Sequence, residues 1–467
     1  MHDPAPPTRF ESVDHDPLPP AVRAAFAQLQ AHDIPHVLLR GYTPVSELAA
    51  SLDIDVFIPA HALDRATPVL EAAGWRRRKV QTGRFPHVFF DNWESASGVV
   101  RSIDVVTSLC YGRELRGLGD DERIIESRVA DHGVCVPAPW MAAFCFALHV
   151  LLDKGGLSVA NRQRGLSLRE RCERDTTSAA MLSEHFGADA ASLTRAFLDS
   201  LDGDDARDLR TLIASAERLP SLRRQPIRAF WHRAGVRWRQ FRRPVGRVAI
   251  FGIDGSGKST LVHMATERSG TMRIHNGYLG NNAYRTPPAK WLSKTIGREL
   301  GAATRSEFRL RILVNLETFW RPFELFARMM IAEHRAELVL YDRFPIGQDD
   351  GTPTTRWGRL VFAYTRLSRA LLPSPDLVIL LDGDDRVIWS RKQEMPFEAH
   401  VRTQTRYRAL IGQLAIEHAT VRTDGTLAES FERLRLAMAN SRSLQNKLYW
   451  ARDGQRDGRS STSSPSP

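Results

Sequence analysis

The chain has 467 residues, 42 % of them hydrophobic and 25 % charged, which is typical of a globular protein with two or more domains. Its four cysteines form no Cys-x-x-Cys pair, which argues against a disulfide framework or a structural zinc site and favours the reducing cytoplasm. The formal net charge of +11 points to acidic partners, such as nucleotides, nucleic acid or an anionic membrane surface.

The first twenty residues are acidic and rich in proline, and they lack the basic and apolar regions of a signal peptide. We expect a disordered leader over 1–20. The longest apolar run, about 141–152, is shorter than the roughly 18 residues that a membrane-spanning helix needs. These features predict a soluble, cytoplasmic protein.

Patterns of helix and strand alternate over 21–137, which predicts an α/β domain. Apolar residues at helical spacing predict helices over 21–34 and 61–75, and short apolar runs predict strands over 36–41, 52–59 and 99–109. A run of charge at 76–79 is expected to be either a solvated edge or an anion-binding rim.

Three aspartates lie on two of these predicted strands. Asp53 and Asp55 are two residues apart and therefore share one face of a strand, while Asp104 lies on a later strand. If the two strands are neighbours, the three carboxylates make a divalent-metal site suited to nucleotidyl transfer.

The order LLRGY, DIDVFI, GWR and SIDVV resembles the polymerase-β-type nucleotidyltransferase fold, and most closely a family of largely uncharacterised bacterial nucleotidyltransferases. The resemblance covers 22–215 and implies that Asp53, Asp55 and Asp104 hold Mg²⁺. Family members usually carry Gly-Ser before the first two aspartates, where this chain has Gly41 and Tyr42. A catalytic metal site, a degenerate domain that only binds, and carboxylates that merely end a strand all stay open.

Two regions separate this domain from the next. Residues 138–220 predict a helical region that packs over the preceding sheet, without a chemical motif. Residues 221–243 hold eight arginines and two tryptophans, and their aromatic stripe predicts a basic amphipathic linker helix over 221–245. A neighbouring domain is its favoured partner, an anionic membrane surface comes second, and nucleic acid is least favoured.

A nucleotide-binding motif follows at 248–260, which read VAIFGIDGSGKST. The pattern GxxxxGK[ST] is typical of loops whose glycines let backbone N–H groups face phosphate oxygens, at the positive end of a helix. Lys258 is expected to reach the β- and γ-phosphates of ATP and Ser259 to bind Mg²⁺. The predicted ATP-binding residues are Gly252, Gly255, Ser256, Gly257, Lys258, Ser259 and Thr260.

Further along the chain, the sequence predicts a loop-rich stretch over 272–288 and a long helix over about 305–334. An apolar strand over 338–341 leads into Asp342, Arg343 and Phe344, and a second apolar strand ends at Asp382. A charged, lid-like segment then extends from Arg391 to about 407. Ligands of parallel sheets bind at the carboxyl ends of such strands.

This order of motifs resembles thymidylate kinase and its relatives among the nucleoside monophosphate kinases over 245–440. The resemblance implies that Asp254 contacts a sugar hydroxyl of the acceptor and that Asp342 helps to place the Mg²⁺–phosphate centre or the acceptor nucleophile. It also implies that Arg343 holds an anionic group of the acceptor and that Arg391 neutralises the transferring phosphoryl group. Thymidylate kinases carry Arg-Glu-Pro-Gly where this chain has MRIHNGYLGNN, which argues against thymidylate as the acceptor.

The predicted fold class is therefore α/β: a nucleotidyltransferase-like domain with a helical extension, then a P-loop kinase domain over 246–442 with a parallel sheet flanked by helices, and a disordered tail over 443–467. The predicted function is ATP- and Mg²⁺-dependent phosphoryl transfer to a small phosphorylated or hydroxyl-bearing metabolite, such as a nucleotide or sugar. Two alternatives remain, an ATP-binding regulatory protein with a degenerate first domain, and an ATP-binding protein of a membrane surface or nucleic acid.

Overall fold

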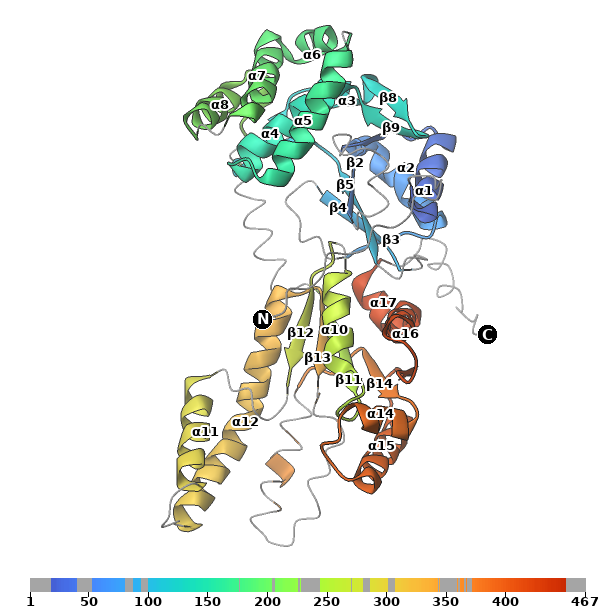
Figure 1. Cartoon of the computed structure of the whole chain (residues 1–467), viewed down its shortest axis with the longest axis vertical. Helices are drawn as coiled ribbons and strands as arrows, with labels where there is room; N and C mark the ends of the chain where they lie inside the picture. Colours follow the sequence, from blue (N-terminus) through green and yellow to red (C-terminus); the bar gives the residue numbers. More distant parts are fainter. Residues whose placement is uncertain are drawn as a thin grey trace, which may run out of the picture. The chain divides into compact units, whose positions relative to one another are not determined.

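Figure 1 shows the computed structural model of the chain. By its internal contacts the chain divides into two compact units, one of 1–75, 83–90 and 103–234, and one of 76–82, 91–102 and 235–467. Gly41, Tyr42, Arg343 and most of the arginine-rich segment lie outside the described residues. The prediction of a linker helix over 221–245 is wrong at its start, because Leu222 and Arg223 form a short strand that pairs with Gly117 and Leu118. The structure describes residues 18–39, 53–79, 87–93, 100–175, 177–203, 206–225, 227, 244–269, 271–279, 286–300, 307–342, 344, 359, 362–364, 367 and 372–450.

The first unit contains a sheet covered by two helices. Strands β1 (Val37–Leu38), β2 (Asp53–Phe57), β5 (Arg101–Val106) and β4 (His87–Asn92) are neighbours in that order. Helices α1 (Pro20–Ala31) and α2 (Leu63–Ala72) pack on it, because apolar residues at helical spacing, such as Val22, Phe26 and Leu29, are buried in a common core with Ile54. These elements confirm the predicted helices and strands, and β4 is an addition to them.

A helical layer follows, as predicted. It comprises α4 (Pro139–Leu148), a π-helical turn (His149–Lys154), α5 (Val159–Arg174), α6 (Ser178–Phe186), α7 (Ala188–Asp199) and α8 (Ala206–Arg218). Helix α4 is buried on all sides, which explains its almost wholly apolar sequence. The smaller elements are η2 (Ala60–Ala62), β6 (Cys110–Tyr111), β7 (Arg116–Leu118), α3 (Arg123–Glu126), β8 (Arg128–Asp131), β9 (Val134–Pro137), η4 (Ser200–Asp202) and β10 (Leu222–Arg223).

The second unit is built on a wholly parallel sheet in the order β12-β13-β11-β14-β15. The strands are β11 (Gly246–Phe251), β12 (Ile274–Tyr278), β13 (Leu338–Asp342), β14 (Leu377–Asp382) and β15 (His418–Arg422). The central strands are buried on both faces, as their continuous apolar sequences predict. The strand β12 lies within 272–288, where the sequence predicted loop, so that prediction is wrong for these five residues.

Helices cover both faces of this sheet. Residues Val248 and Ile250 pack in one core with α10 (Lys258–Glu267), α16 (Leu427–Asn440) and α17 (Arg442–Leu448). Residues Ala249 and Phe251, on the opposite face, pack with α12 (Glu307–Arg335) and α15 (Phe397–Gly412). The remaining helices are α11 (Pro287–Leu300) and α14 (Asp385–Arg391).

Two expectations about polar segments are corrected in this unit. Helix α17 occupies the start of the predicted disordered tail, and Leu444 and Leu448 are buried in the core, which holds it in place. Arg78, in the charge run predicted to be a solvated edge or an anion-binding rim, is fully buried. Its guanidinium bonds to both oxygens of Asp91 and lies 3.0 Å from Glu337 Oε2.

Two further expectations concern cysteines and membranes. The four cysteines are all free, as expected. Among the helices of the described residues, none has both the length and the apolar character needed to cross a bilayer.

Candidate functional site

The glycine-rich loop connects β11 to α10 in the second unit. Gly255 and Gly257 have φ angles of 92° and 85°, which lie in the left-handed region that favours glycine. Gly257 is the N-cap of α10, so the loop runs directly into the positive end of this helix. The local sequence therefore produces the strand, loop and helix order that a phosphate-binding loop requires.

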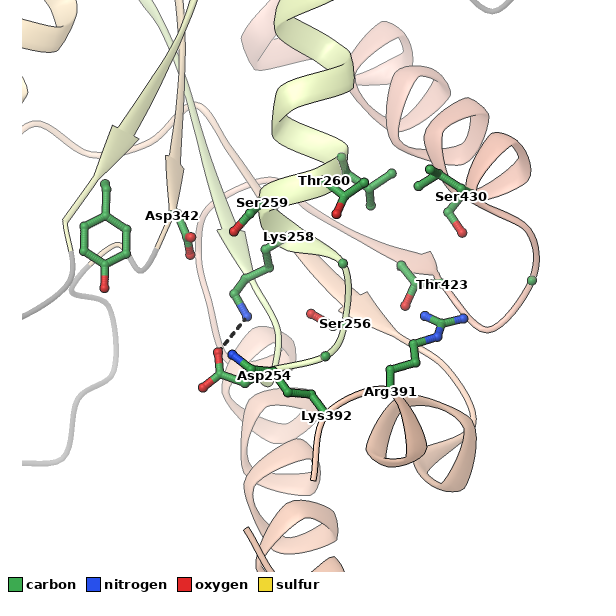
Figure 2. Close-up of a pocket in the computed structure, with 16 residues that line it drawn as sticks. Asp254, Ser256, Lys258, Ser259, Thr260, Asp342, Arg391, Lys392, Thr423 and Ser430 are labelled. Atoms are coloured by element: carbon green, nitrogen blue, oxygen red, sulfur yellow. Dashed lines mark ion pairs between the residues drawn. The ribbon is translucent and has the colours of Figure 1, made fainter. Parts of the chain in front are cut away.

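Lys258, at the first turn of α10, folds back over this loop. Its Nζ atom donates to the backbone oxygens of Gly252 at 2.7 Å and Ile253 at 2.8 Å, and lies 3.7 Å from Asp254 Oδ1 (Figure 2). The ammonium group is largely buried, so it has lost most of its contact with water. A phosphate group bound in the loop would offer this ammonium a stronger, charged acceptor than the backbone oxygens.

A cavity of about 630 Å³ opens beside the loop, at the carboxyl ends of the parallel strands (Figure 2). Asp342 enters it from the end of β13 and the loop enters it from the end of β11. Arg391 and Lys392 enter it from the end of α14. The lining residues are Asp254, Gly255, Ser256, Gly257, Lys258, Ser259, Thr260, Leu261, Tyr278, Asp342, Arg391, Lys392, Thr423, Gly425, Leu427 and Ser430.

The structure thus brings together most of the residues that the sequence singled out for this half of the chain. Gly252 is not among the residues that line the cavity, and a Cβ atom on it would come within 2.5 Å of Ser256 Oγ. That hydroxyl is buried, and among the described residues it has no hydrogen-bond partner. Arg343 lies outside the described residues, so its predicted role is untested.

Sequence reasoning missed the part of the cavity that follows β15. Thr423, Gly425, Leu427 and Ser430 line it, at the start of α16. A local signal was present, because Thr426 and Glu429 form a capping box that marks the beginning of this helix. Nothing in the sequence places that helix beside the glycine-rich loop, since the placement depends on the pairing of β15 with β14.

The three predicted aspartates of the first unit also come together. Asp53 and Asp55 on β2 and Asp104 on β5 each place a carboxylate oxygen within 4.8 Å of the others. The Nδ1 atom of His87, on β4, lies 2.8 Å from Asp104 Oδ1. Burial disfavours the charged imidazole, but the hydrogen bond and charge of Asp104 outweigh it and raise the pKa of His87. Carboxylate oxygens are the donors that Mg²⁺ prefers.

The loop, the parallel sheet and the cavity define the second unit as a P-loop nucleotide-binding fold. No protein-family model matches the chain. Among curated proteins it is similar to "Uncharacterized ATP-binding protein YghS" of Escherichia coli (strain K12), with 30 % identity over 118 residues. The match covers 22 % of this chain and 48 % of that protein, so the chain spans about half the length of the curated relative it matches.

Among solved structures, the chain is similar to a thymidylate kinase from Candida albicans, with 18 % identity, a TM-score of 0.28 and coverage of 43 % of this chain and 94 % of that one. It is also similar to a deoxyadenosine kinase from M. mycoides with bound dATP, with 15 % identity, a TM-score of 0.28 and coverage of 41 % and 99 %. A thymidylate kinase from Ehrlichia chaffeensis gives 16 % identity, a TM-score of 0.23 and coverage of 41 % and 97 %.

Proposed function

We propose that the second unit transfers the γ-phosphoryl group of ATP to a small metabolite that bears a hydroxyl or phosphate group. The observation that carries the proposal is the convergence of Lys258, Arg391 and Asp342 on one cavity beside the glycine-rich loop. Phosphoryl transfer depends mainly on positioning the reactants and on neutralising their negative charge. Here Lys258, Arg391 and the positive end of α10 would neutralise that charge. ATP is favoured as the donor because the E. coli relative is described as ATP-binding.

Two residues of the cavity fit a magnesium ion. The Ser259 hydroxyl and the buried Asp342 carboxylate offer the hard oxygen atoms that this ion prefers. When bound, the ion would neutralise negative charge on the phosphate oxygens. Asp254 and Tyr278 lie at the same cavity and are the groups we assign to the acceptor.

Transfer of label from γ-labelled ATP to a panel of sugars, nucleosides and nucleoside monophosphates tests this proposal. Lys258→Ala removes a charge-assisted hydrogen bond to phosphate, and we expect ATP affinity to fall roughly ten- to a hundredfold. Lys294→Ala, at an exposed position of α11, is the matched control and should leave affinity unchanged. If no acceptor takes up label and Lys258→Ala binds ATP normally, the proposal fails. Binding without transfer would favour the ATP-binding regulatory protein instead.

The three carboxylates of the first unit favour a second function, metal-dependent nucleotidyl transfer, which we propose for that unit. The resemblance to polymerase-β-type nucleotidyltransferases supports the same assignment, as does the hydrogen bond that fixes Asp104 to His87. The two activities on one chain would suit successive steps on one metabolite, phosphorylation followed by nucleotidyl transfer.

Manganese binding without nucleotide, followed by electron paramagnetic resonance, tests the metal site. The double variant Asp53→Asn/Asp55→Asn should lose binding at least about tenfold, because two of three charged ligands become neutral. Asp64→Asn, at an exposed position of α2, is the control. Equal manganese binding by both variants would exclude the site.

A further inference from the structure

The carboxylate of Asp382, at the end of β14, binds two side chains of α15. It accepts hydrogen bonds from Gln404 Nε2 at 2.7 Å, from Arg408 Nε at 2.9 Å and from Arg408 Nη2 at 2.7 Å. Burial would raise its pKa, but the hydrogen bonds from Arg408 and Gln404 outweigh it and hold the pKa of Asp382 below its ordinary value. Of the described residues, Asp382 is not one that lines the nucleotide cavity.

Arg408 connects two elements at the base of a helical hairpin, residues 384–412, which we call the lid hairpin. Its guanidinium binds Asp382 at the end of β14. The Nη2 atom of the same guanidinium also lies 3.3 Å from Asp385 Oδ1, at the start of α14. Gln404 and Arg408 are four residues apart on α15 and therefore present one face to the strand. This clamp therefore ties α14 and α15 to the end of β14.

The other end of the lid hairpin lies against the glycine-rich loop. Trp389 Nε1 donates to the backbone oxygen of Met395 at 2.8 Å, and its ring meets Phe397 edge-on at 5.8 Å. A Cβ atom on Gly255 would lie 2.8 Å from the backbone oxygen of Ile388, so the hairpin and the loop are in close contact. Arg391 and Lys392 at this end line the cavity, as Figure 2 shows.

Asp382 also holds a second part of the cavity lining. Its backbone oxygen accepts from Thr423 N at 2.7 Å, and Thr423 lines the cavity after β15. One residue outside the cavity therefore anchors two of its walls. Because charge stabilisation depends on cations placed within hydrogen-bond distance of the phosphoryl group, small movements of these walls would matter.

We propose that Arg408, acting through Asp382, is a positioning residue that sets the lid hairpin so that Arg391 and Lys392 meet the γ-phosphate of ATP. The inference rests on the proposed phosphotransferase function and extends it to residues that do not touch the nucleotide. Its consequence is selective: Arg408 governs the preference for ATP over ADP, because ADP has no γ-phosphate for the hairpin to meet.

Titration of the full chain with Mg·ATP and with Mg·ADP tests this inference. In Arg408→Met, ATP affinity should fall roughly tenfold while ADP affinity stays within about twofold of the wild-type value. Asp382→Asn removes the charge of the same ion pair and should shift the ratio in the same direction, and the effects of the two substitutions should be less than additive in the double variant because they share that contact. Arg408→Lys keeps the charge but not the two-pronged geometry and should restore the preference only in part. Arg402→Met, exposed on the same helix, is the matched control.

The outcomes separate the two proposals. An unchanged ratio of ATP to ADP affinity in Arg408→Met would overturn the positioning role. Equal loss of both nucleotides, together with a lower melting temperature, would make Arg408 a structural residue and would also overturn it. If the wild-type chain binds neither nucleotide, the proposed function itself fails.

Discussion

At the scale of single residues, the glycines of the P-loop matter through the conformations that they permit. Gly255 has a φ of 92°, and a Cβ atom there would lie 2.8 Å from the Ile388 oxygen and 3.3 Å from Lys392 Cβ. A side chain at this position would strain the backbone and also push the lid hairpin away. Both effects act on the part of the cavity that is expected to bind phosphate. A side chain at position 255 would therefore disturb this part twice, through the loop and through the hairpin.

We therefore predict that Gly255→Ala weakens binding of both ATP and ADP. Backbone strain of this kind is worth about 1–3 kcal/mol, which corresponds to roughly a 5- to 150-fold loss of affinity. Both nucleotides should lose affinity because the loop meets phosphates that they share, whereas Arg408→Met should affect ATP alone. ATP should lose more than ADP, because the displaced hairpin also carries Arg391 and Lys392 away from the γ-phosphate. Calorimetric titration of the full chain provides the measurement.

Gly297→Ala is the matched control for that variant. This glycine lies in α11, where a Cβ atom would meet open space and helix propensity favours alanine by up to about 1 kcal/mol. We expect unchanged nucleotide binding and equal or slightly higher stability. Normal nucleotide binding by Gly255→Ala would mean that the loop can shift without loss, and would refute the prediction.

At the scale of elements, the sequence predicts best those strands that are buried on both faces. β13 and β14 are continuous apolar runs, and both lie where the pattern places them. β12 reads IHNGY, and its histidine, asparagine and glycine predict a loop; in the structure only two of its five residues are buried. Gly277 fits there because a Cβ atom would come within 2.6 Å of the Tyr341 ring on the next strand, a contact that no local pattern reveals.

The same limit applies to the candidate site. The motif at 248–260 is local, so the loop wall of the cavity could be predicted from it. The wall formed by Thr423, Gly425 and Leu427 comes from a distant element, and its capping box marks the start of a helix without placing that helix beside the loop. The contact between Arg408 and Asp382 joins residues that are 26 positions apart. In the sequence, Arg408 looks like an ordinary charge on a solvated helix. Such contacts depend on tertiary structure, which single-sequence patterns do not contain.

At the scale of the whole molecule, residues from the first third of the chain belong to the core of the second unit. Segments 76–82 and 91–102 are part of this unit, and Trp93 and Val100 are buried in the core beneath α10. Trp93 Nε1 donates to the hydroxyl of Tyr449 at 2.6 Å, and that hydroxyl donates to Asp91 Oδ2 at 2.9 Å. No pattern in the sequence predicts that these segments join the second unit, because the arginines at 76–78 look like part of an ordinary solvated charged run.

Arg78 is the centre of this buried network, and its loss should destabilise the second unit strongly. Asp91 and Glu337 are buried with it, and their charges raise its pKa against the opposing effect of burial. Arg78→Met leaves both carboxylates without their cation, and removal of one partner from a buried ion pair typically costs about 3–5 kcal/mol. Urea unfolding of the full chain, monitored by circular dichroism, should report that decrease in the free energy of unfolding.

Two further variants test whether the loss comes from uncompensated charge. Arg65→Met removes an exposed arginine. Among the described contacts, its guanidinium meets only the backbone oxygens of His32 and Asp33, so the free energy of unfolding should change by less than about 1 kcal/mol. The triple variant Arg78→Met/Asp91→Asn/Glu337→Gln makes the whole network neutral and should recover much of the stability that Arg78→Met loses, because no charge is left buried without a partner. If Arg78→Met unfolds at the same urea concentration as Arg65→Met, the network does not hold the N-terminal segments in the second unit. If the triple variant is no more stable than Arg78→Met, the loss comes from packing and hydrogen bonds instead of charge.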